Sequence, residues 1–293
     1  MPPAMFHHEY YPWTYLLPDG RLFIAGPHVP TQRFDSTAHA GVESFATSAG
    51  DRSSGGEKGT SVMAMDYRPL VYIMAGDLPG TADSVEQIDL SAPAPAWTPV
   101  ASLNEPRAQQ CTATLLPDGR IHVAGGLGGG TDGGPSELFD PRNAGAGWIL
   151  GPTMTYARGY HSSFLLLRDG SILGGGDPGG PGGPTPRERF YPDYFDLVRP
   201  TSTNAPATIK YGTTFQVDTP TPPDIAEVVL LRPGAVTHGF NQSQRGLELV
   251  VSGTGAGTID VESPPDRTSH RPAGICSSCS TDRECPRWGG GSG

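Results

Sequence analysis

Short apolar runs separated by polar turns recur along much of the chain, and they predict β-strands. The segments "YLLPDGRLFIAG", "LLPDGRIHVAGG" and "LLLRDGSILGGG" each hold an apolar run, an Asp-Gly pair and a second apolar run that ends in glycine. Two such runs joined by Asp-Gly are typical of a β-hairpin, because both turn residues tolerate positive φ. The segment "YRPLVYIMAG" follows the same pattern without the Asp-Gly pair. No helical periodicity of useful length interrupts these strands.

These segments form an internal repeat. Their closing glycines are Gly26, Gly76, Gly125 and Gly175, so successive units are 50, 49 and 50 residues apart. Two units also share a later part, since "SVEQIDLSAPAPAW" and "PSELFDPRNAGAGW" both hold an acidic-apolar-Asp core and a closing Trp. A period of this length with four short strands per unit is typical of kelch-type β-propeller blades. We therefore predict about four blades in residues 1–198, with an unrelated Gly-rich β-sandwich as the alternative.

The pattern changes near residue 198. Residues 199–266 begin rich in Pro and Thr and continue with strand-like segments such as "IAEVVLLRPG" and "LELVVSGTGAGTIDVESPP". Short alternating strands with frequent turns predict a small immunoglobulin-like β-sandwich. The predicted fold class is therefore all-β: a partial kelch β-propeller of about four blades, followed by an immunoglobulin-like β-sandwich.

Charge and hydropathy narrow the classes of partner. The 293 residues contain 20 Lys and Arg against 30 Asp and Glu, a formal net charge of -10. This balance argues against a nucleic-acid groove or an anionic membrane surface. No apolar run approaches the roughly 20 residues that span a bilayer. The opening "MPPAMFHHEYYPW" has neither a basic n-region nor an apolar h-region, so we expect no signal peptide within these residues.

The strand pattern is lost at the end of the chain. Residues 267–293 hold Cys276, Cys279 and Cys285, but no second pair or suitably spaced His follows, so neither zinc nor a disulfide is favoured. We predict that these residues are disordered. A shift of the reading frame near Asp266 is one explanation, and it would leave the sandwich without its last strand.

Two histidines far apart in the sequence are candidates for a metal site. His161 follows Tyr160 in "ARGYHSSFLLLRDG", and His238 lies in "LLRPGAVTHGFNQSQRGLEL". Imidazole is the usual nitrogen ligand for copper, and two imidazoles with a phenolate oxygen fit a tetragonal Cu(II) set. Taken alone, Tyr160 is more often a half-buried strand aromatic. His122, which alternates with apolar neighbours in "GRIHVAGG", fits an ordinary strand position better than a ligand.

Both segments resemble motifs of the galactose oxidase and glyoxal oxidase family of copper-radical oxidases. "RPTSTNAPATIKYGTTFQVD" resembles the start of the family's C-terminal sandwich, and the similarity runs from about Tyr10 to Pro265. The resemblance implies that Tyr160, His161 and His238 bind copper. It also implies that Tyr160 takes the proton of a small alcohol, aldehyde or carbohydrate substrate, that O2 is reduced to H2O2, and that the protein works outside the cell or in its envelope.

The sequence departs from the family where the radical cofactor is concerned. In the family this cofactor is a Tyr joined to a Cys by a thioether bond. Cys111, the one cysteine before the tail, lies in an apolar strand and fits a small core residue. We therefore predict that the Cys-Tyr cofactor is absent, that the chain matches the C-terminal half of a family member, and that it is inactive as written. A non-catalytic binding module for carbohydrate or protein is the alternative function.

Arg107, in "EPRAQQ", is a further candidate for the site. The family has an arginine that faces the substrate near the propeller axis, so the resemblance implies a substrate contact for Arg107. A solvated or salt-bridged arginine fits the sequence at least as well.

Overall fold

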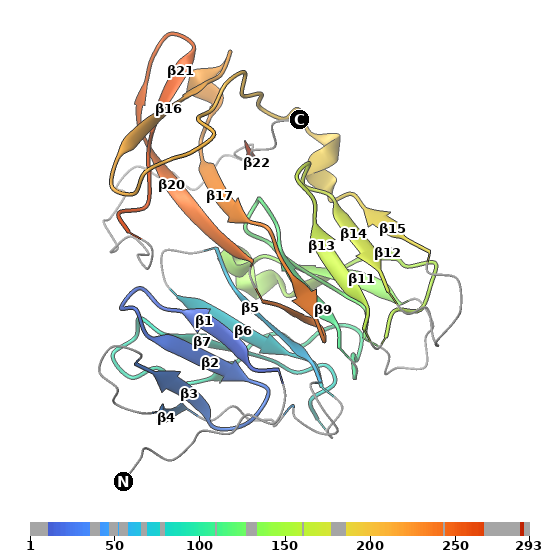
Figure 1. Ribbon diagram of the computed structural model, residues 1–293. Helices are drawn as coiled ribbons and strands as arrows, with labels where there is room; N and C mark the ends of the chain where they lie inside the picture. Colours follow the sequence, from blue (N-terminus) through green and yellow to red (C-terminus); the bar gives the residue numbers. More distant parts are fainter. Residues whose placement is uncertain are drawn as a thin grey trace.

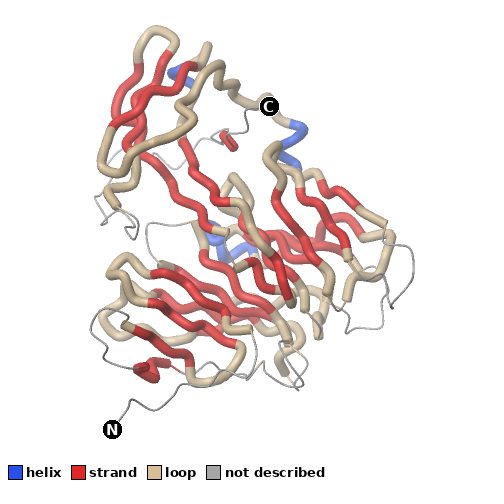
Figure 2. The backbone as a smooth tube through the Cα atoms, in the orientation of Figure 1, coloured by secondary structure: helices blue, strands red, loops and turns tan. Residues whose placement is uncertain are grey.

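The computed structural model describes residues 11–35, 42–46, 52, 58–65, 69–76, 80–108, 110–126, 134–159, 161–176, 186–242, 244–266 and 288–289. Throughout these residues the strands form five sheets and one two-stranded hairpin, as Figures 1 and 2 show. Helix is limited to three short 3-10 segments: η1 Pro141–Ala146, η2 Asp193–Asp196 and η3 Pro222–Asp224. The predicted all-β class is confirmed.

Four antiparallel sheets follow one another along the chain, and each forms one blade (Figure 1). Blade 1 is β1-β2-β3-β4, blade 2 is β5-β6-β7-β8, blade 3 is β9-β10-β11-β12, and blade 4 holds β13-β14-β15. The strands are β1 Trp13–Leu16, β2 Leu22–Gly26, β3 Thr31–Phe34, β4 Val42–Ala46, β5 Thr60–Met63, β6 Leu70–Met74, β7 Val85–Asp89, β8 Thr98–Pro99, β9 Thr112–Leu115, β10 Ile121–Ala124, β11 Pro135–Phe139, β12 Trp148–Thr153, β13 Ser163–Leu166, β14 Ile172–Gly175 and β15 Glu188–Phe190.

The Asp-Gly pairs form the predicted tight turns between the first two strands of blades 1, 3 and 4. In each turn the glycine takes positive φ, with 82° at Gly20, 83° at Gly119 and 90° at Gly170. The aspartate plays a different part from the one expected. Its carboxylate accepts a backbone hydrogen bond from the residue two positions on, as Asp19 does from Arg21 at 3.0 Å. This Asx turn satisfies the backbone without moving the aspartate into the left-handed region.

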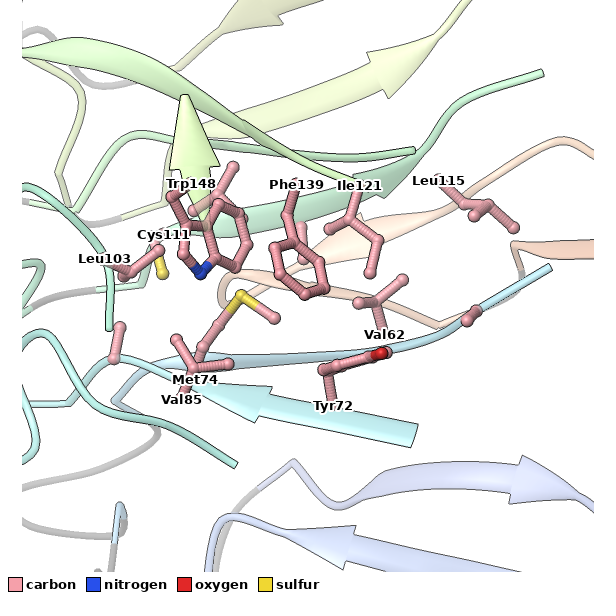
Figure 3. Packing of buried hydrophobic residues seen from close by; sticks show 14 of the residues in the cluster. Val62, Tyr72, Met74, Val85, Leu103, Cys111, Leu115, Ile121, Phe139 and Trp148 are labelled. Carbon is pink, nitrogen blue, oxygen red and sulfur yellow. The ribbon is translucent and has the colours of Figure 1, made fainter. Parts of the chain in front are cut away.

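An apolar cluster fills each interface between neighbouring blades. Between blades 2 and 3, Phe139 stacks on Trp148 with ring centroids 4.9 Å apart, and Tyr72 meets Phe139 edge-on (Figure 3). Cys111 is fully buried in the same cluster. Comparable clusters lie between blades 1 and 2 and between blades 3 and 4. Because each inner blade is covered on both faces, the strands β6, β9 and β10 are buried along their whole length.

A buried arginine precedes the first strand of blades 2, 3 and 4 and joins each blade to the one before it. The carbonyl of Arg107 accepts a hydrogen bond from the Gly76 amide of blade 2, and the carbonyl of Arg158 accepts one from the Gly126 amide of blade 3. The guanidinium then binds a carboxylate of its own blade. These ion pairs are Arg52–Glu86 at 3.1 Å, Arg107–Glu137 at 3.0 Å and Arg158–Glu188 at 3.1 Å. We call these contacts the arginine joints.

The C-terminal strands form a sheet of order β16-β21-β20-β17-β22. The strands are β16 Thr214–Asp218, β17 Val228–Arg232, β20 Arg245–Thr254, β21 Thr258–Glu262 and β22 Trp288–Gly289. One face is closed by its own apolar cluster, whose buried members are Val217, Val228, Leu249, Ile259 and Val261. Between β17 and β20 lies a short hairpin formed by β18 Val236–Thr237 and β19 Phe240–Asn241, which we call the histidine hairpin.

Within this sheet, strands β17 and β20 extend toward the blades, where they lie beside β9 (Figure 1). Val229 and Leu231 of β17 join the apolar cluster between blades 2 and 3. Gly246 lets β20 approach closely, because a Cβ there would stand 2.7 Å from a Leu115 methyl group. On the outer side Arg142 of η1 pairs with Glu227 and Glu248. The sandwich is thereby fixed to blade 3 by both apolar and charged contacts.

The predicted domain limits stay predictions, since the sheets alone do not set a boundary at residue 198. The expectation that residues 267–293 are disordered lies outside the described residues, apart from β22. That strand pairs in parallel with β17, with Trp288 opposite Val228. No helix within the described ranges is both long and apolar enough to cross a bilayer.

Candidate metal site

The structure brings His161 and His238 together. His161 lies directly ahead of β13 in blade 4, and His238 lies at the turn of the histidine hairpin. The hairpin contacts β5, β9 and β13, so three blades surround it. The Nε2 atoms of the two histidines are 3.1 Å apart, and their ring planes are nearly perpendicular, at 86°. Residues 77 positions apart in sequence therefore point the same ring nitrogen at one spot.

An irregular backbone aims His161 at this spot. Its φ is 60°, in the left-handed region, which costs a residue other than glycine about 1–3 kcal/mol. The backbone amide of His161 donates to Oε1 of Gln110 at 2.9 Å, and this bond holds the strained residue in place. Gly176 passes against the same peptide, since a Cβ there would meet the His161 carbonyl oxygen at 2.6 Å. The regular alternation of strand side chains is thus broken where β13 begins.

The backbone of His238 is strained in the same sense, with φ at 52°. The next residue, Gly239, is pressed against blade 3, because a Cβ there would lie 2.7 Å from the Cys111 carbonyl oxygen and 2.9 Å from the Cα of Gln110. The hydroxyl of Thr60 in blade 2 donates to the Gly239 carbonyl at 2.8 Å. Contacts from blades 2 and 3 therefore hold the turn that carries His238. Gln110 lies against this turn and also binds the backbone amide of His161.

Ring contacts fix the orientation of the His238 imidazole. Its Nδ1 lies 2.7 Å from the hydroxyl oxygen of Thr237. With Nδ1–H donating to that oxygen, the lone pair is on Nε2, the atom that faces His161. Tyr11 stacks on the imidazole of His238, parallel to it within 13° and with ring centroids 3.6 Å apart.

The segment after the hairpin is clamped to blade 3. The side-chain amide of Gln244 accepts from the Leu115 amide at 2.7 Å and donates to the Leu115 carbonyl at 2.8 Å. Asn241 donates to the same Gln244 oxygen at 2.9 Å. Phe240, which is 1% exposed, inserts into the apolar cluster between blades 1 and 2. The histidine hairpin is therefore seated by hydrogen bonds on one side and by an aromatic anchor on the other.

The two imidazole nitrogens fit a metal ion. Two nitrogen ligands at about 2.0–2.1 Å from an ion and at a right angle to each other lie about 2.9 Å apart. The observed 3.1 Å matches this spacing. Tyr160, the predicted third ligand, lies outside the described residues. Within those residues no group of three or more His, Cys, Asp and Glu side chains could hold an ion.

Arg107 lies in an arginine joint. Its guanidinium is 3% exposed and donates to the carbonyls of Gly125 at 2.8 Å and Pro135 at 2.6 Å, besides its ion pair with Glu137. This is the salt-bridged arrangement that the sequence left open. A contact of Arg107 with a substrate stays a prediction.

Cys111 and His122 are both interior groups. The Cys111 thiol is free, and burial raises its pKa to about 12, so it stays protonated. His122 is 1% exposed and stacks on Phe190, with ring centroids 4.7 Å apart. Burial, with a smaller effect of the Arg107 charge, lowers the pKa of His122 to about 3. The imidazole is therefore neutral, and His122 occupies the plain strand position that the sequence suggested.

Sequence reasoning missed the residues that orient the histidines. Gln110, Thr237 and Tyr11 were not among the predicted ligands. A weak signal was present for Thr237, because a ligating histidine usually donates its second ring N–H to an oxygen acceptor and Thr237 places a hydroxyl beside His238. For Gln110 and Tyr11 the sign is their place in the repeat, since each stands eight residues before the aspartate of its Asp-Gly turn, as His161 does.

Comparisons with known proteins define the class. Residues 199–278 match the family model of the galactose oxidase-like early set domain. A fungal alcohol oxidase of the AA5 family, solved in complex with copper, has the same fold, with a TM-score of 0.72 at 23% identity over 90% of this chain and 60% of that one. The predicted fold, propeller blades followed by an immunoglobulin-like early set domain, is confirmed.

Curated relatives point to the same family. The aldehyde oxidase GLOX of Vitis pseudoreticulata is 26% identical over 83% of this chain, and the galactose oxidase of Gibberella zeae is 25% identical over 90%. The chain is thus similar to the galactose and glyoxal oxidases, as its motifs predicted. It spans 53% and 42% of these two proteins, about half of their length.

Proposed function

We propose that this chain binds copper through the Nε2 atoms of His161 and His238, with the Tyr160 phenolate as third ligand. The observation that carries the proposal is the 3.1 Å distance between the two nitrogens. Two imidazoles and a phenolate suit Cu(II) better than the hard cations Mg²⁺ and Ca²⁺, which prefer oxygen ligands. The strained backbone at both histidines supports a functional site, because such strain collects where the surrounding structure holds a catalytic or ligand-binding geometry.

The reaction class follows from the resemblance. Copper supplies one-electron and O2 chemistry when it is bound, and the family oxidises primary alcohols or aldehydes with formation of H2O2. In this chain His161 and His238 would fix the position of the ion. Tyr160 would accept the proton of a substrate hydroxyl, since a phenolate beside the bound oxygen is placed for general base catalysis. We extend the same resemblance to an extracellular or cell-envelope location and to small alcohol, aldehyde or carbohydrate substrates.

We further propose that these residues alone do not sustain oxidase turnover. The radical cofactor of the family requires a cysteine linked to a tyrosine. The Cys111 thiol is buried in the cluster between blades 2 and 3, where its high pKa keeps it unreactive. Binding of copper without turnover is therefore the function that this chain supports.

A titration of the purified chain with Cu(II) tests the first part. We expect one tight site in the wild type and at least a hundredfold weaker binding in His161→Ala and in His238→Ala. His122→Leu, which changes a histidine whose ring stacks on Phe190, is the control and should bind as the wild type does. Equal affinity in all four proteins would refute the site.

Hydrogen peroxide release tests the second part. Copper-loaded protein is incubated with primary alcohols and with glyoxal-type aldehydes, and peroxide is measured. We expect no release above the rate of the metal salt alone. Release that depends on the protein and is lost in Tyr160→Phe would show that the chain is an active oxidase.

A further inference from the structure

We propose that Tyr11 is a positioning residue for the metal site, which holds the His238 imidazole in its ligating orientation by stacking on it. The inference rests on the proposed function, since it assigns a role toward the same ion. The observation behind it is the parallel contact of the two rings, 3.6 Å between centroids at 13°. Tyr11 has no place in the motifs that predicted the ligands.

The stack belongs to a ladder of aromatic contacts between β1 and the histidine hairpin. Tyr11 comes two residues before Trp13, and His238 comes two residues before Phe240. Trp13 and Phe240 are both buried, and their ring centroids are 6.4 Å apart. Tyr11 lies just before β1 and His238 lies in the turn just before β19, so the buried pair anchors the two segments that carry the stacked rings. Tyr15 adds a further step, edge-on to Phe240 at 5.8 Å.

The stack acts on a part of the ring that the Thr237 bond does not. The turn at Gly239 fixes the backbone, and Thr237 binds a nitrogen at the edge of the imidazole. Tyr11 instead lies parallel to the flat face of the ring. A contact on this face opposes tilting of the ring and keeps the Nε2 lone pair directed at His161. Rigid support of a ligand by neighbouring side chains raises the affinity of a metal site, as second-shell contacts generally do.

Tyr11 is suited to a test because it is not part of the core. Its side chain is 41% exposed, whereas Trp13 beside it is fully buried. Tyr156 offers a matched control, since it is also 41% exposed and lies ahead of β13 in blade 4. Substitution of either tyrosine should leave the melting temperature nearly unchanged. A loss of Cu(II) affinity in the Tyr11 variant alone would then come from the stack on His238 and not from a loss of stability.

The first measurement uses Cu(II) alone as the probe. Affinity is measured by competition with a chelator, and the electron paramagnetic resonance spectrum reports the ligand geometry. We expect Tyr11→Phe to bind within threefold of the wild type with the same spectrum. We expect Tyr11→Ala to bind about tenfold more weakly, with a broadened or shifted spectrum, and Tyr156→Ala to behave as the wild type. Wild-type affinity and spectrum in Tyr11→Ala would overturn the proposal, as would equal losses in the Phe and Ala variants.

The second measurement uses metal-free protein and separates this proposal from the proposed function. A stacked tyrosine shifts the ring-proton resonances of the histidine beneath it. We expect the His238 resonances to shift in Tyr11→Ala and to be restored in Tyr11→Phe. If these shifts appear while the wild type binds no Cu(II), the stack is real, but the copper site and the positioning role fail together. If the resonances do not move, the stacking itself is refuted.

Discussion

The arginine joints and the seat of the histidine hairpin both connect distant parts of the chain, but they do so in different ways. An arginine joint recurs at about the length of one unit, since the three glutamates are 51 positions apart and the three arginines are 55 and 51 positions apart. The hairpin is seated by contacts that occur once. Thr60 reaches Gly239 over 179 positions of sequence. Repeated contacts build the blades, and unrepeated ones build the site.

The difference explains what the sequence could reveal. The 50-residue period, the Asp-Gly turns and the change near residue 198 predicted the sheets, because each depends on neighbouring residues. The motifs also indicated His161 and His238. The left-handed backbone at both histidines could not be predicted, since it is imposed by Gln110 and Gly239, whose contacts arise only after the blades and the sandwich have come together.

Removal of a joint should have the largest effect on stability. Arg107→Met leaves the Glu137 carboxylate, which is fully buried, without its cation. We expect the free energy of unfolding to fall by about 3–5 kcal/mol, measured by urea denaturation. Arg158→Met should cost less, because Glu188 is 23% exposed and water can solvate it. A larger loss in Arg158→Met than in Arg107→Met would contradict this account of the joints.

Loss of the aromatic anchor should come next. Phe240→Ala removes the ring that packs against Trp13 and Tyr15, and we expect a loss of about 3 kcal/mol. Because this residue carries the hairpin, Cu(II) binding should weaken at the same time. Phe215→Ala in the sandwich cluster is the control, which should lower stability and leave copper affinity intact. Retention of affinity in Phe240→Ala would show that the anchor does not hold the site.

The buried His122 predicts sensitivity to acid. Its pKa is about 3 in the folded chain against 6.5 in the unfolded one, so the unfolded chain alone takes up a proton between these values. Stability from this residue is complete above pH 6.5 and declines as pH falls toward 3. Between pH 7.5 and 4.5 the wild type should lose about 2–3 kcal/mol more than His122→Leu. Identical pH dependence of the two proteins would remove His122 as the cause.

The smallest effect on stability is expected at the clamp, the pair of hydrogen bonds by which Gln244 holds the backbone of Leu115. Gln244→Leu leaves the amide and carbonyl of Leu115 without their partner, and we expect a loss of about 1–2 kcal/mol. Thermal unfolding at neutral pH measures it. Gln216→Leu, which removes an exposed bond to Asp260, should cost almost nothing. If both variants melt together with the wild type, the clamp contributes nothing to the docking of the sandwich.

The separation of the two histidines also sets when the site can exist during synthesis. The ribosome adds His161 77 residues before His238, which at about 5–20 residues per second is a delay of roughly 4–15 s. Gln244 must follow before the hairpin can be clamped to the blades. A nascent chain therefore presents one imidazole to the surrounding medium for seconds before the second arrives. At the proposed copper site, capture of the ion would then be a late event, and a chain that holds it would already have joined its blades to its sandwich.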